Sequence, residues 1–394
     1  MLTSIALIFI LGMFLAFFFE KLRLPGLIGM IMTGIILGPC VLNMLDPSLL
    51  SISADLRQFA LVIILTRAGL SLNIEDLKKV GRPAVMMCFV PACFEIAGTA
   101  IIAPHFFNIS FVDALIVGSV IAAVSPAVIV PRMIKIIQDG YGQKNSIPQL
   151  ILAGSSVDDV FVIVMFTAFT GIAAGGSFSA TSLLQIPVSI TLGILAGIIC
   201  GKLISKFFKK FISRDIVKVI MLLSVSFLLI ELENDLKEIV PFSGLLAIMS
   251  IGLTMFQTDR ETAKKLSAKY NSLWVGAEVI LFVLVGATVD LAYVRNAGIA
   301  AIGVVVFALI FRMCGVFSCL LGTKLEKREK IFCMLAYTPK ATVQAAIGSI
   351  PLAMGLSCGS VVLTIAVVSI LLTAPFGAIC VDRFYPRLLK KDAA

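Results

Sequence analysis

Long runs of apolar residues alternate with short polar segments along the whole of the 394-residue chain. Each run is roughly 17 to 25 residues long, the length that an α-helix needs to cross the ~30 Å hydrocarbon core of a bilayer. Because a backbone inside lipid must satisfy its own hydrogen bonds, such runs are expected to be helices. The pattern predicts about thirteen spans, near residues 2–19, 25–42, 56–73, 83–105, 110–136, 147–173, 181–207, 215–231, 240–256, 272–293, 297–321, 330–355 and 358–381.

The composition agrees with a chain that lies mostly in lipid. Hydrophobic residues make up 59% of it and charged residues only 14%. A soluble protein of this size would need more polar surface to cover itself. We therefore predict an all-α polytopic membrane protein and not an enzyme.

The basic residues indicate an orientation. If the N-terminus is outside, 26 of the 32 lysines and arginines fall in cytoplasmic segments, and only Arg57, Lys237 and Arg295 fall on the outer side. This bias predicts an outside start and a cytoplasmic end, in a membrane that we expect to be a bacterial inner (plasma) membrane. It also explains the net charge of +9. Because the basic residues are spread over several loops, without interleaved aromatic residues, we expect no nucleic-acid partner.

The chain also repeats itself with an offset near 217 residues. The stretch LPGLIGMIMTGIIL from Leu24 resembles VPFSGLLAIMSIGL from Val240, and ILTRAGLSLN around Gly69 resembles VLVGATVDLA around Gly286. An offset of seven spans is odd, so the second copy would enter the membrane upside down. Two inverted six-helix repeats are typical of transporters, whose substrate sites lie near the midplane where the copies meet.

Proline residues interrupt the fifth span and the twelfth. Ser125 and Pro126 lie in the middle of one, and Thr338, Pro339 and Lys340 in the corresponding part of the other. Proline removes a backbone hydrogen bond and disfavours helix in the preceding residue, so we predict two crossing broken helices. Lys340 would offset exposed carbonyl ends and the Ser125 hydroxyl could face an ion. The alternative is a simple proline kink with Lys340 reaching toward the interface.

Two adjacent carboxylates, Asp158 and Asp159, lie within the sixth span. A charged aspartate near the bilayer centre costs at least ~2.5 to 3.5 kcal/mol, so a pair indicates function more than packing. Neighbours on a helix point about 100° apart and should have different roles. If Asp159 faces a cavity, H⁺ and a small cation would compete for it, since burial disfavours its charged form and the cation binds only deprotonated oxygens. Such competition produces antiport.

Other ionisable residues are buried in their spans. The repeat places Glu95 and Arg312 at equivalent positions, 217 residues apart, and we predict an ion pair between them that holds the core together. The alternative is that each faces water separately. Arg67 and Glu278 could line an ion vestibule, an interface or a dimer contact. The nine cysteines sit singly, so we expect small core residues and no cofactor.

The motifs LPGLIGMIMTGIILGP, AVSPAVIVP, GSSVDDV and PKATVQAAIGS, in this order, resemble those of the sodium/proton antiporters in the monovalent cation–proton antiporter superfamily, above all its NHA group. The resemblance covers nearly the whole chain. It implies Na⁺, Li⁺ and H⁺ as substrates, with Asp159 as the main carrier of ion or proton and Asp158 assisting. Some relatives carry Thr-Asp where this chain has Ser125-Pro126, and many electrogenic relatives carry lysine in place of Arg312, which leaves the stoichiometry open.

The resemblance also implies a homodimer of thirteen-helix subunits in a lipid bilayer, with a core that moves as an elevator. The expected parts are a dimer domain at 1–80 and 211–295, a core at 81–175 and 296–383, a linker helix at 176–210, and a cytoplasmic tail at 384–394.

Three other functions were weighed from the sequence. An intramembrane aspartyl protease takes its two carboxylates from separate helices, and adjacent aspartates cannot adopt that geometry. A K⁺/H⁺ antiporter or potassium-efflux protein could share the architecture. A sodium-coupled organic-anion symporter could share the broken helices, but it would not require this aspartate pair.

Overall fold

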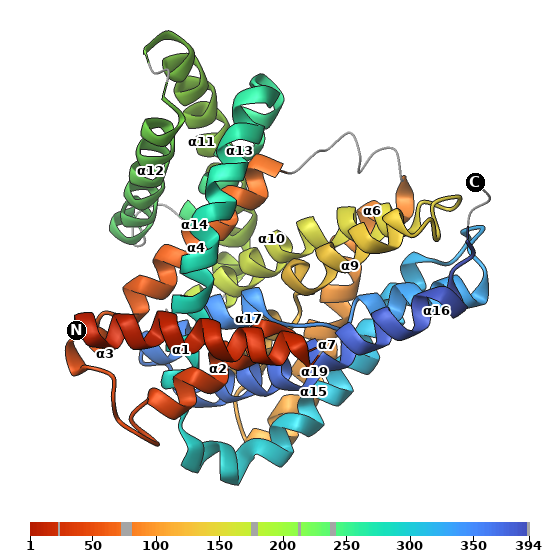
Figure 1. Cartoon of the computed structure of the whole chain (residues 1–394), viewed down its shortest axis with the longest axis horizontal. Helices are drawn as coiled ribbons and strands as arrows, with labels where there is room; N and C mark the ends of the chain where they lie inside the picture. The colour runs from red at the N-terminus through yellow and green to blue at the C-terminus, as the bar shows by residue number, and fades with distance from the viewer. Residues whose placement is uncertain (23, 72–80, 175–179, 212–213, 237–241, 392–394) are drawn as a thin grey trace. The chain divides into compact units, whose positions relative to one another are not determined.

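The computed structural model describes residues 1–22, 24–71, 81–174, 180–211, 214–236 and 242–391 (Figure 1). Regular structure in these ranges is helical, apart from one isolated bridge between Tyr141 and Lys391. Parts of two sequence predictions lie outside the described residues, namely the basic residues Arg23, Lys78, Lys79 and Lys237 and the first two residues of the VPFSGLL motif.

The chain forms two compact units. The first comprises Met1–Ala54, Ile74–Ala174 and Leu281–Ala394, and the second comprises Asp55–Asn73 and Gly175–Ile280. This division differs from the domains expected from sequence, since the N-terminal segment belongs with the expected core. All residues of the candidate site described below lie in the first unit.

The helices of the first unit are α1 (Leu2–Lys21), α2 (Gly26–Leu37), α3 (Pro47–Ser51), α6 (Arg82–Met87), α7 (Val90–Phe107), α8 (Phe111–Ile121), α9 (Pro126–Gln138), α10 (Ile147–Ala174), α15 (Leu291–Cys319), α16 (Lys327–Ala336), α17 (Thr342–Ile347), α18 (Ile350–Ala353) and α19 (Gly359–Leu388). Those of the second unit are α4 (Ser53–Ser71), α11 (Ala180–Phe211), α12 (Asp215–Leu236), α13 (Gly244–Thr258) and most of α14 (Arg260–Ala287).

Each expected span overlaps one of these helices or a group of shorter ones. Eight helical stretches are long and apolar enough to cross a membrane, and three shorter ones are apolar. The prediction of an all-helical polytopic membrane protein is confirmed.

The fifth and twelfth spans are interrupted. In the fifth, α8 ends at Ile121 and α9 begins at Pro126; in the twelfth, α16 ends at Ala336 and α17 begins at Thr342. The two interruptions touch, because the Ser125 backbone N–H donates to the Pro339 carbonyl at 2.8 Å. Non-helical backbone buried among helices is tolerated in a membrane only where it finds such partners.

Two further interruptions were not predicted. The fourth span breaks between α6 and α7, just before Pro91, and α17 gives way to α18 just before Pro351. Both prolines stand in the first turn of the following helix, where a missing N–H costs nothing. The sequence reading treated these segments as continuous because their hydrophobicity does not change at the break.

Glycines allow close packing at two corresponding places. In the first unit Gly34 of α2 lies against Gly286 of α14, and in the second Gly69 of α4 lies against Gly252 of α13. A Cβ atom on any of the four would come within 3.0 Å of the facing backbone. Small residues at such crossings let membrane helices approach closely.

Candidate ion-binding site

Asp158 of α10 is held at the interruption of the fifth span. Its side chain is fully buried. The backbone N–H of Val124, within the interruption, donates to Asp158 Oδ2 at 2.8 Å, and Arg312 Nη2 of α15 lies 2.7 Å from the same oxygen. The first aspartate of the pair is therefore already occupied by protein donors.

Arg312 is the centre of a buried network. Its Nη1 lies 2.9 Å from Glu95 Oε2 on α7 and also donates to the Ala122 carbonyl, while its Nε donates to the Tyr337 carbonyl at 2.8 Å. The Tyr337 ring lies below the guanidinium, 5.4 Å from centroid to Cζ. Arginine offers five N–H donors in a rigid fork and can satisfy several acceptors at once. The side chain thus joins α7, α10, α15 and the two interruptions.

Lys340 does not face the carbonyl ends as we expected. Its Nζ lies 2.6 Å from Glu95 Oε2, and its backbone N–H donates to Thr373 Oγ1 at 2.9 Å. A charge-assisted hydrogen bond to a carboxylate is about twice as strong as one to a neutral carbonyl. The carbonyl ends of α8 are instead satisfied by Arg312, at Ala122, and by Gln344 Nε2, which lies 2.9 Å from the Ala123 carbonyl.

The charges in this network balance when all groups are ionised. Glu95 and Asp158 contribute two negative charges, and Arg312 and Lys340 two positive ones, all fully buried. Buried ions are tolerated when paired and hydrogen-bonded in this way.

Asp159 lies beside the network but has no ion pair in the described part of the chain. Its side chain is partly buried, and its Oδ1 is buried without a hydrogen-bond partner. The Ser125 hydroxyl and Asp158 Oδ1 are likewise buried without partners. Unsatisfied buried oxygens are rare, and oxygens are the ligands that alkali and other hard cations take.

Sequence reasoning missed Gln344, Tyr337 and Thr373. Gln344 is nearly fully buried and lies within the PKATVQAAIGS motif, so an intramembrane amide beside the second break was the available signal. Tyr337 and Thr373 act through a backbone carbonyl and a hydroxyl, for which the sequence carries no specific signal.

Arg67 and Glu278 are in the second unit, on α4 and α14. The Arg67 guanidinium lies 6.0 Å from the centre of the Trp274 ring. The structure does not bring either residue into the network of the first unit, and the vestibule remains a prediction.

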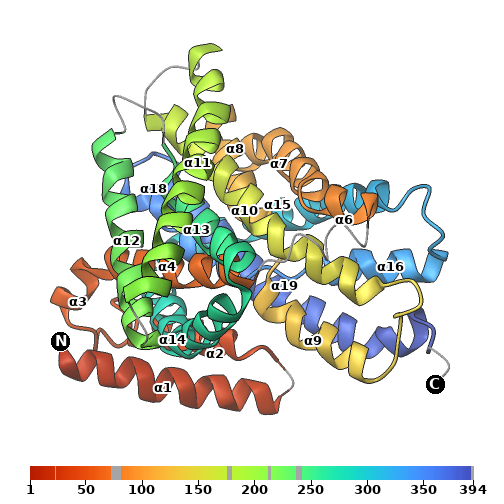
Figure 2. The same cartoon turned by 90° about the horizontal axis from the view of Figure 1, so that it is seen from above.

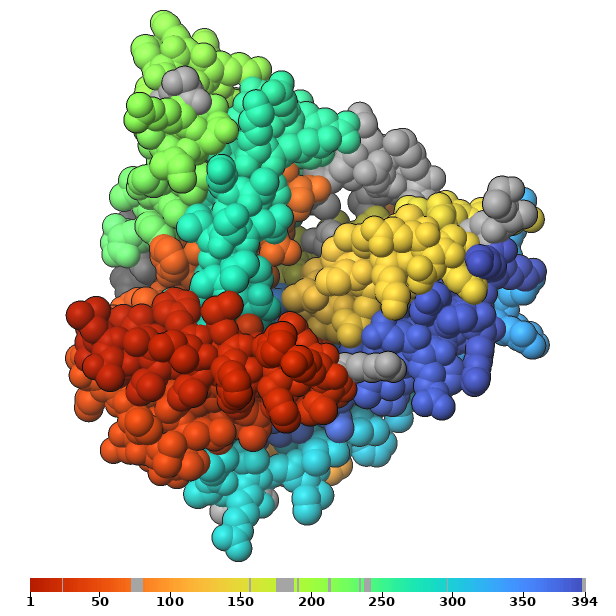
Figure 3. All heavy atoms as spheres, viewed as in Figure 1, coloured from red at the N-terminus to blue at the C-terminus, as the bar shows by residue number. Residues whose placement is uncertain are grey.

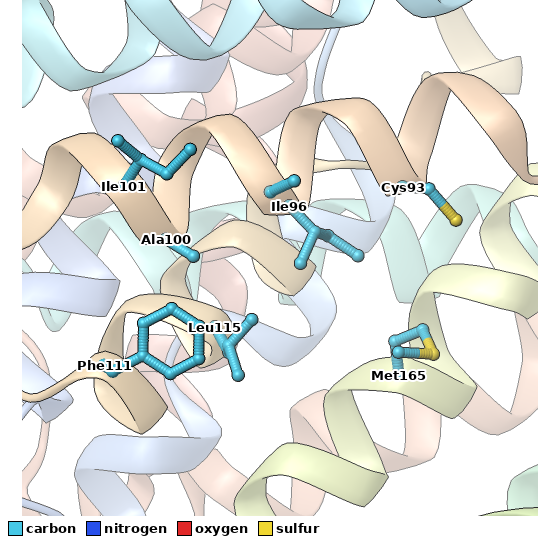
Figure 4. A pocket seen from close by; sticks show the side chains of 8 residues that line it. Cys93, Ile96, Ala100, Ile101, Phe111, Leu115 and Met165 are labelled. Carbon is cyan, nitrogen blue, oxygen red and sulfur yellow. The ribbon is translucent and has the colours of Figure 1, made fainter.

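A cavity of about 400 Å³ lies between α7, α8 and α10 (Figure 4). Its lining is almost entirely apolar and includes Ile96, Phe111 and Met165. Because an ion needs oxygen ligands, this cavity is not the ion site.

Comparison with known proteins identifies the group to which this site belongs. Residues 5–384 match the profile of the family described as "Sodium/hydrogen exchanger, transmembrane". The chain belongs to this family. It is 32% identical over 382 residues to sodium/hydrogen exchanger 9B2 of Homo sapiens, covering 93% of this chain and 70% of that protein, and 31% identical over 382 residues to the same exchanger of Pongo abelii, with the same coverage.

The fold also matches a solved structure. The sodium proton antiporter MjNhaP1 from Methanocaldococcus jannaschii superposes with a TM-score of 0.84 at 21% identity, over 98% of this chain and 97% of that one. The resemblance noted in the sequence is confirmed, as is the prediction of a transporter and not an enzyme.

Proposed function

We propose that the protein exchanges Na⁺ or Li⁺ for H⁺ across the membrane, with Asp159 as the group that carries either ion. Membership of the exchanger family and the printed names of its relatives support the reaction. The observation that carries the assignment is the charge balance at the site, where four ionised groups neutralise one another and Asp159 is left over.

The left-over charge couples the two ions. A lone carboxylate in this setting is costly until a proton or a cation neutralises it. The cation requires the deprotonated form, so one occupant excludes the other. If the transport core changes its open side only when the carboxylate is neutralised, each crossing of Na⁺ in one direction must be matched by H⁺ in the other. This is antiport by alternating access.

Asp158 and Ser125 have supporting roles in this proposal. Asp158 keeps one oxygen on Arg312 and Val124 and has a second, Oδ1, without a partner. That oxygen and the free hydroxyl of Ser125 would add to the Na⁺ coordination beside Asp159. Pro126, Thr338 and Pro339 support the site by ending the helices at the crossing.

We further propose that the chain consists of two inverted repeats. The two glycine contacts support this, since Gly34 and Gly252 are equivalent under the repeat, and so are Gly69 and Gly286. The buried contact between Glu95 and Arg312, at equivalent positions, adds to it. Thirteen spans, a homodimer and an elevator-like core follow by analogy with the family, with the domain limits given from sequence.

The orientation proposed from the basic residues places the N-terminus outside and the C-terminal segment in the cytoplasm. The membrane is proposed to be a plasma membrane.

The assignment is tested with purified protein in liposomes that carry an internal pH dye. Addition of Na⁺ or Li⁺ to the parent should change the dye signal, and Asp159→Asn should abolish the response, because an amide can neither bind H⁺ nor neutralise Na⁺. Asp113→Asn is the matched control, since this aspartate caps the N-terminus of α8 and asparagine also caps helices well. Its activity should equal that of the parent.

Three outcomes would count against the proposal. An undiminished Na⁺ response in Asp159→Asn would remove that residue from the carrier role. A response to K⁺ alone would favour the K⁺/H⁺ antiporter. A Na⁺ response that depends on an added organic anion would favour the symporter.

A further inference from the structure

Three helix ends meet on the side of the first unit away from the ion site. They are the C-terminal end of α9, the N-terminal end of α16 and the C-terminal end of α19, which lie close together in Figures 1 and 2. Figure 3 shows the α9 region in yellow packed directly against the dark blue of α19. We name this contact region the clasp, defined by Asp139, Tyr141, Asn145, Glu326, Glu329, Tyr385 and Lys390.

One half of the clasp joins α19 to the loop after α9. The Tyr385 hydroxyl donates to Asp139 Oδ2 at 2.7 Å, and its ring meets that of Tyr141 edge to face, with centroids 5.3 Å apart. The backbone N–H of Gly142 donates to the Lys390 carbonyl at 2.9 Å. Gly142 has φ +68°, a conformation that favours glycine.

The other half joins α16 to the same loop and to the segment after α19. Asn145 Nδ2 lies 3.0 Å from each carboxylate oxygen of Glu329, and Glu329 Oε2 also accepts from the backbone N–H of Glu326 at 2.9 Å. Lys390 Nζ contacts Glu326 Oε1. Glu329 is only 2% exposed, and its printed partners are an amide and a backbone N–H, with no cation among them.

Beneath the clasp, an apolar cluster runs toward the ion site. Leu389, 4% exposed, packs into a cluster that also contains Ile136, Phe332, Cys333 and Tyr337. Tyr337 is the residue whose carbonyl and ring contact Arg312. From Glu329 to Tyr337 is eight residues, or about 12 Å of helix rise. One short, rigid helix therefore connects the clasp to the network.

We infer that Asn145 and Glu329 are positioning residues for ion binding. They fix the far end of α16 against the loop after α9. Because α9 starts at Ser125 and α16 ends next to Tyr337, the clasp sets how the two interruptions meet. A loosened clasp lets Tyr337 and Arg312 shift, which disturbs the charge balance around Asp159 and weakens cation binding. This inference rests on the proposed function.

The decisive variant is Asn145→Asp. It places a second carboxylate within hydrogen-bond distance of Glu329, and the other ionisable groups facing Glu329 are Glu326 and Cys333 on α16 and Lys390 after α19. At low pH the two carboxyls share a proton, and at higher pH both ionise and repel each other. The KM for Na⁺ should therefore rise with pH relative to the parent, by about three- to tenfold, while the maximal rate changes less.

The rescue is Asn145→Asp combined with Glu329→Gln. This pair again has one carboxylate and one amide, with the roles exchanged, so the KM and its pH profile should return to those of the parent. A merely structural disturbance at residue 145 would not be repaired by a change at residue 329.

A second readout needs no transport. Cys333 is fully buried in the cluster, and in Asn145→Asp its alkylation by a maleimide, followed by peptide mass spectrometry, should become severalfold faster at high pH. Cys358, buried outside the cluster, is the matched thiol and should not change. If the parent shows no Na⁺-driven proton movement, the proposed function fails, and Cys333 still tests the clasp.

The inference is overturned if Asn145→Asp keeps the parental KM profile and Cys333 stays protected. Should Asn145→Asp fail to fold, Tyr385→Phe removes only the hydroxyl that bonds Asp139 and is expected to raise the KM by about two- to threefold. An unchanged KM in Tyr385→Phe would then overturn the inference.

Discussion

At the residue scale, the site is an arrangement of charges in which one carboxylate has no partner. Asp159 differs from Asp158 only by one position on α10, yet Asp158 is held by Arg312 and Val124 while Asp159 is not. The 100° turn between neighbours on a helix is enough to separate a structural acid from a transporting one.

Glu95→Gln tests whether charge balance governs ion binding. The change leaves Arg312 and Lys340 opposed by Asp158 alone, so the added positive charge replaces the cation that Asp159 would otherwise need. We expect Na⁺ affinity to fall on the order of tenfold, and thermal stability to fall because a partner is removed from a buried pair. Equilibrium Na⁺ binding and the melting temperature of the purified protein measure the two effects.

The matched variant is Glu95→Gln combined with Lys340→Gln. It removes one charge of each sign and should recover most of the affinity and the stability, a coupling that a double-mutant cycle quantifies. Equal Na⁺ affinity in the single and the double variant would mean that the network's net charge does not matter.

The sequence identified most of these residues but few of their partners. Glu95 and Arg312 could be matched because a repeat puts them at equivalent positions. The partner of Lys340 could not be predicted, since it depends on which of several nearby acceptors the crossing brings within reach. Gln344 and Tyr337 act on main-chain carbonyls, which every residue has.

At the element scale, breaks and caps decide where the helices stop. Pro126 and Pro339 mark two breaks that could be read from sequence because polar residues accompany them. The breaks before Pro91 and Pro351 have apolar surroundings, so hydrophobic patterning alone did not reveal them. Helix limits at the membrane surface also differ from the apolar runs, as in α14, which begins at Arg260 in a polar stretch.

Asp259 explains that early start and provides a prediction. It precedes α14, and its carboxylate accepts from the Thr262 backbone N–H at 3.1 Å and from the Thr262 hydroxyl at 3.0 Å, with Lys209 Nζ 3.7 Å away. Partial burial raises the pKa of Asp259, but the Thr262 hydrogen bonds and the Lys209 charge outweigh it, so the pKa lies below its ordinary value. Asp259→Ala should cost about 1 kcal/mol in the stability of α14.

The pH dependence of this cap has a definite sign. Because the folded pKa is depressed, the stabilisation is present above the unfolded value of about 3.9 and is lost as the pH falls through the folded value. The melting temperatures of the parent and Asp259→Ala should therefore differ at pH 7 and converge below about pH 4. A difference that persists at low pH would assign the effect to packing and not to the carboxylate.

At the scale of the whole molecule, hydrophobic periodicity defined the class of protein and the order of its spans. The length of each apolar run is imposed by the bilayer, so the spans could be placed without knowledge of their packing. The division into units could not, because it depends on contacts between distant segments, such as the close approach of Gly34 to Gly286. For the same reason the N-terminal helices could not be assigned to the unit that contains the site.

The path of the chain through the membrane provides the last prediction. Ser51, after α2, and Lys324, before α16, are both exposed, and nine of the expected spans separate them. An odd number places them on opposite sides, and the distribution of basic residues puts Lys324 in the cytoplasm. In intact cells a membrane-impermeant maleimide should label Ser51→Cys, whereas Lys324→Cys should react only after permeabilisation. Peptide mass spectrometry separates these thiols from the nine native cysteines. The reverse pattern would invert the orientation but keep the span count. Labelling of both from one side would require an even number of crossings between them, which is incompatible with thirteen spans and with an inverted repeat.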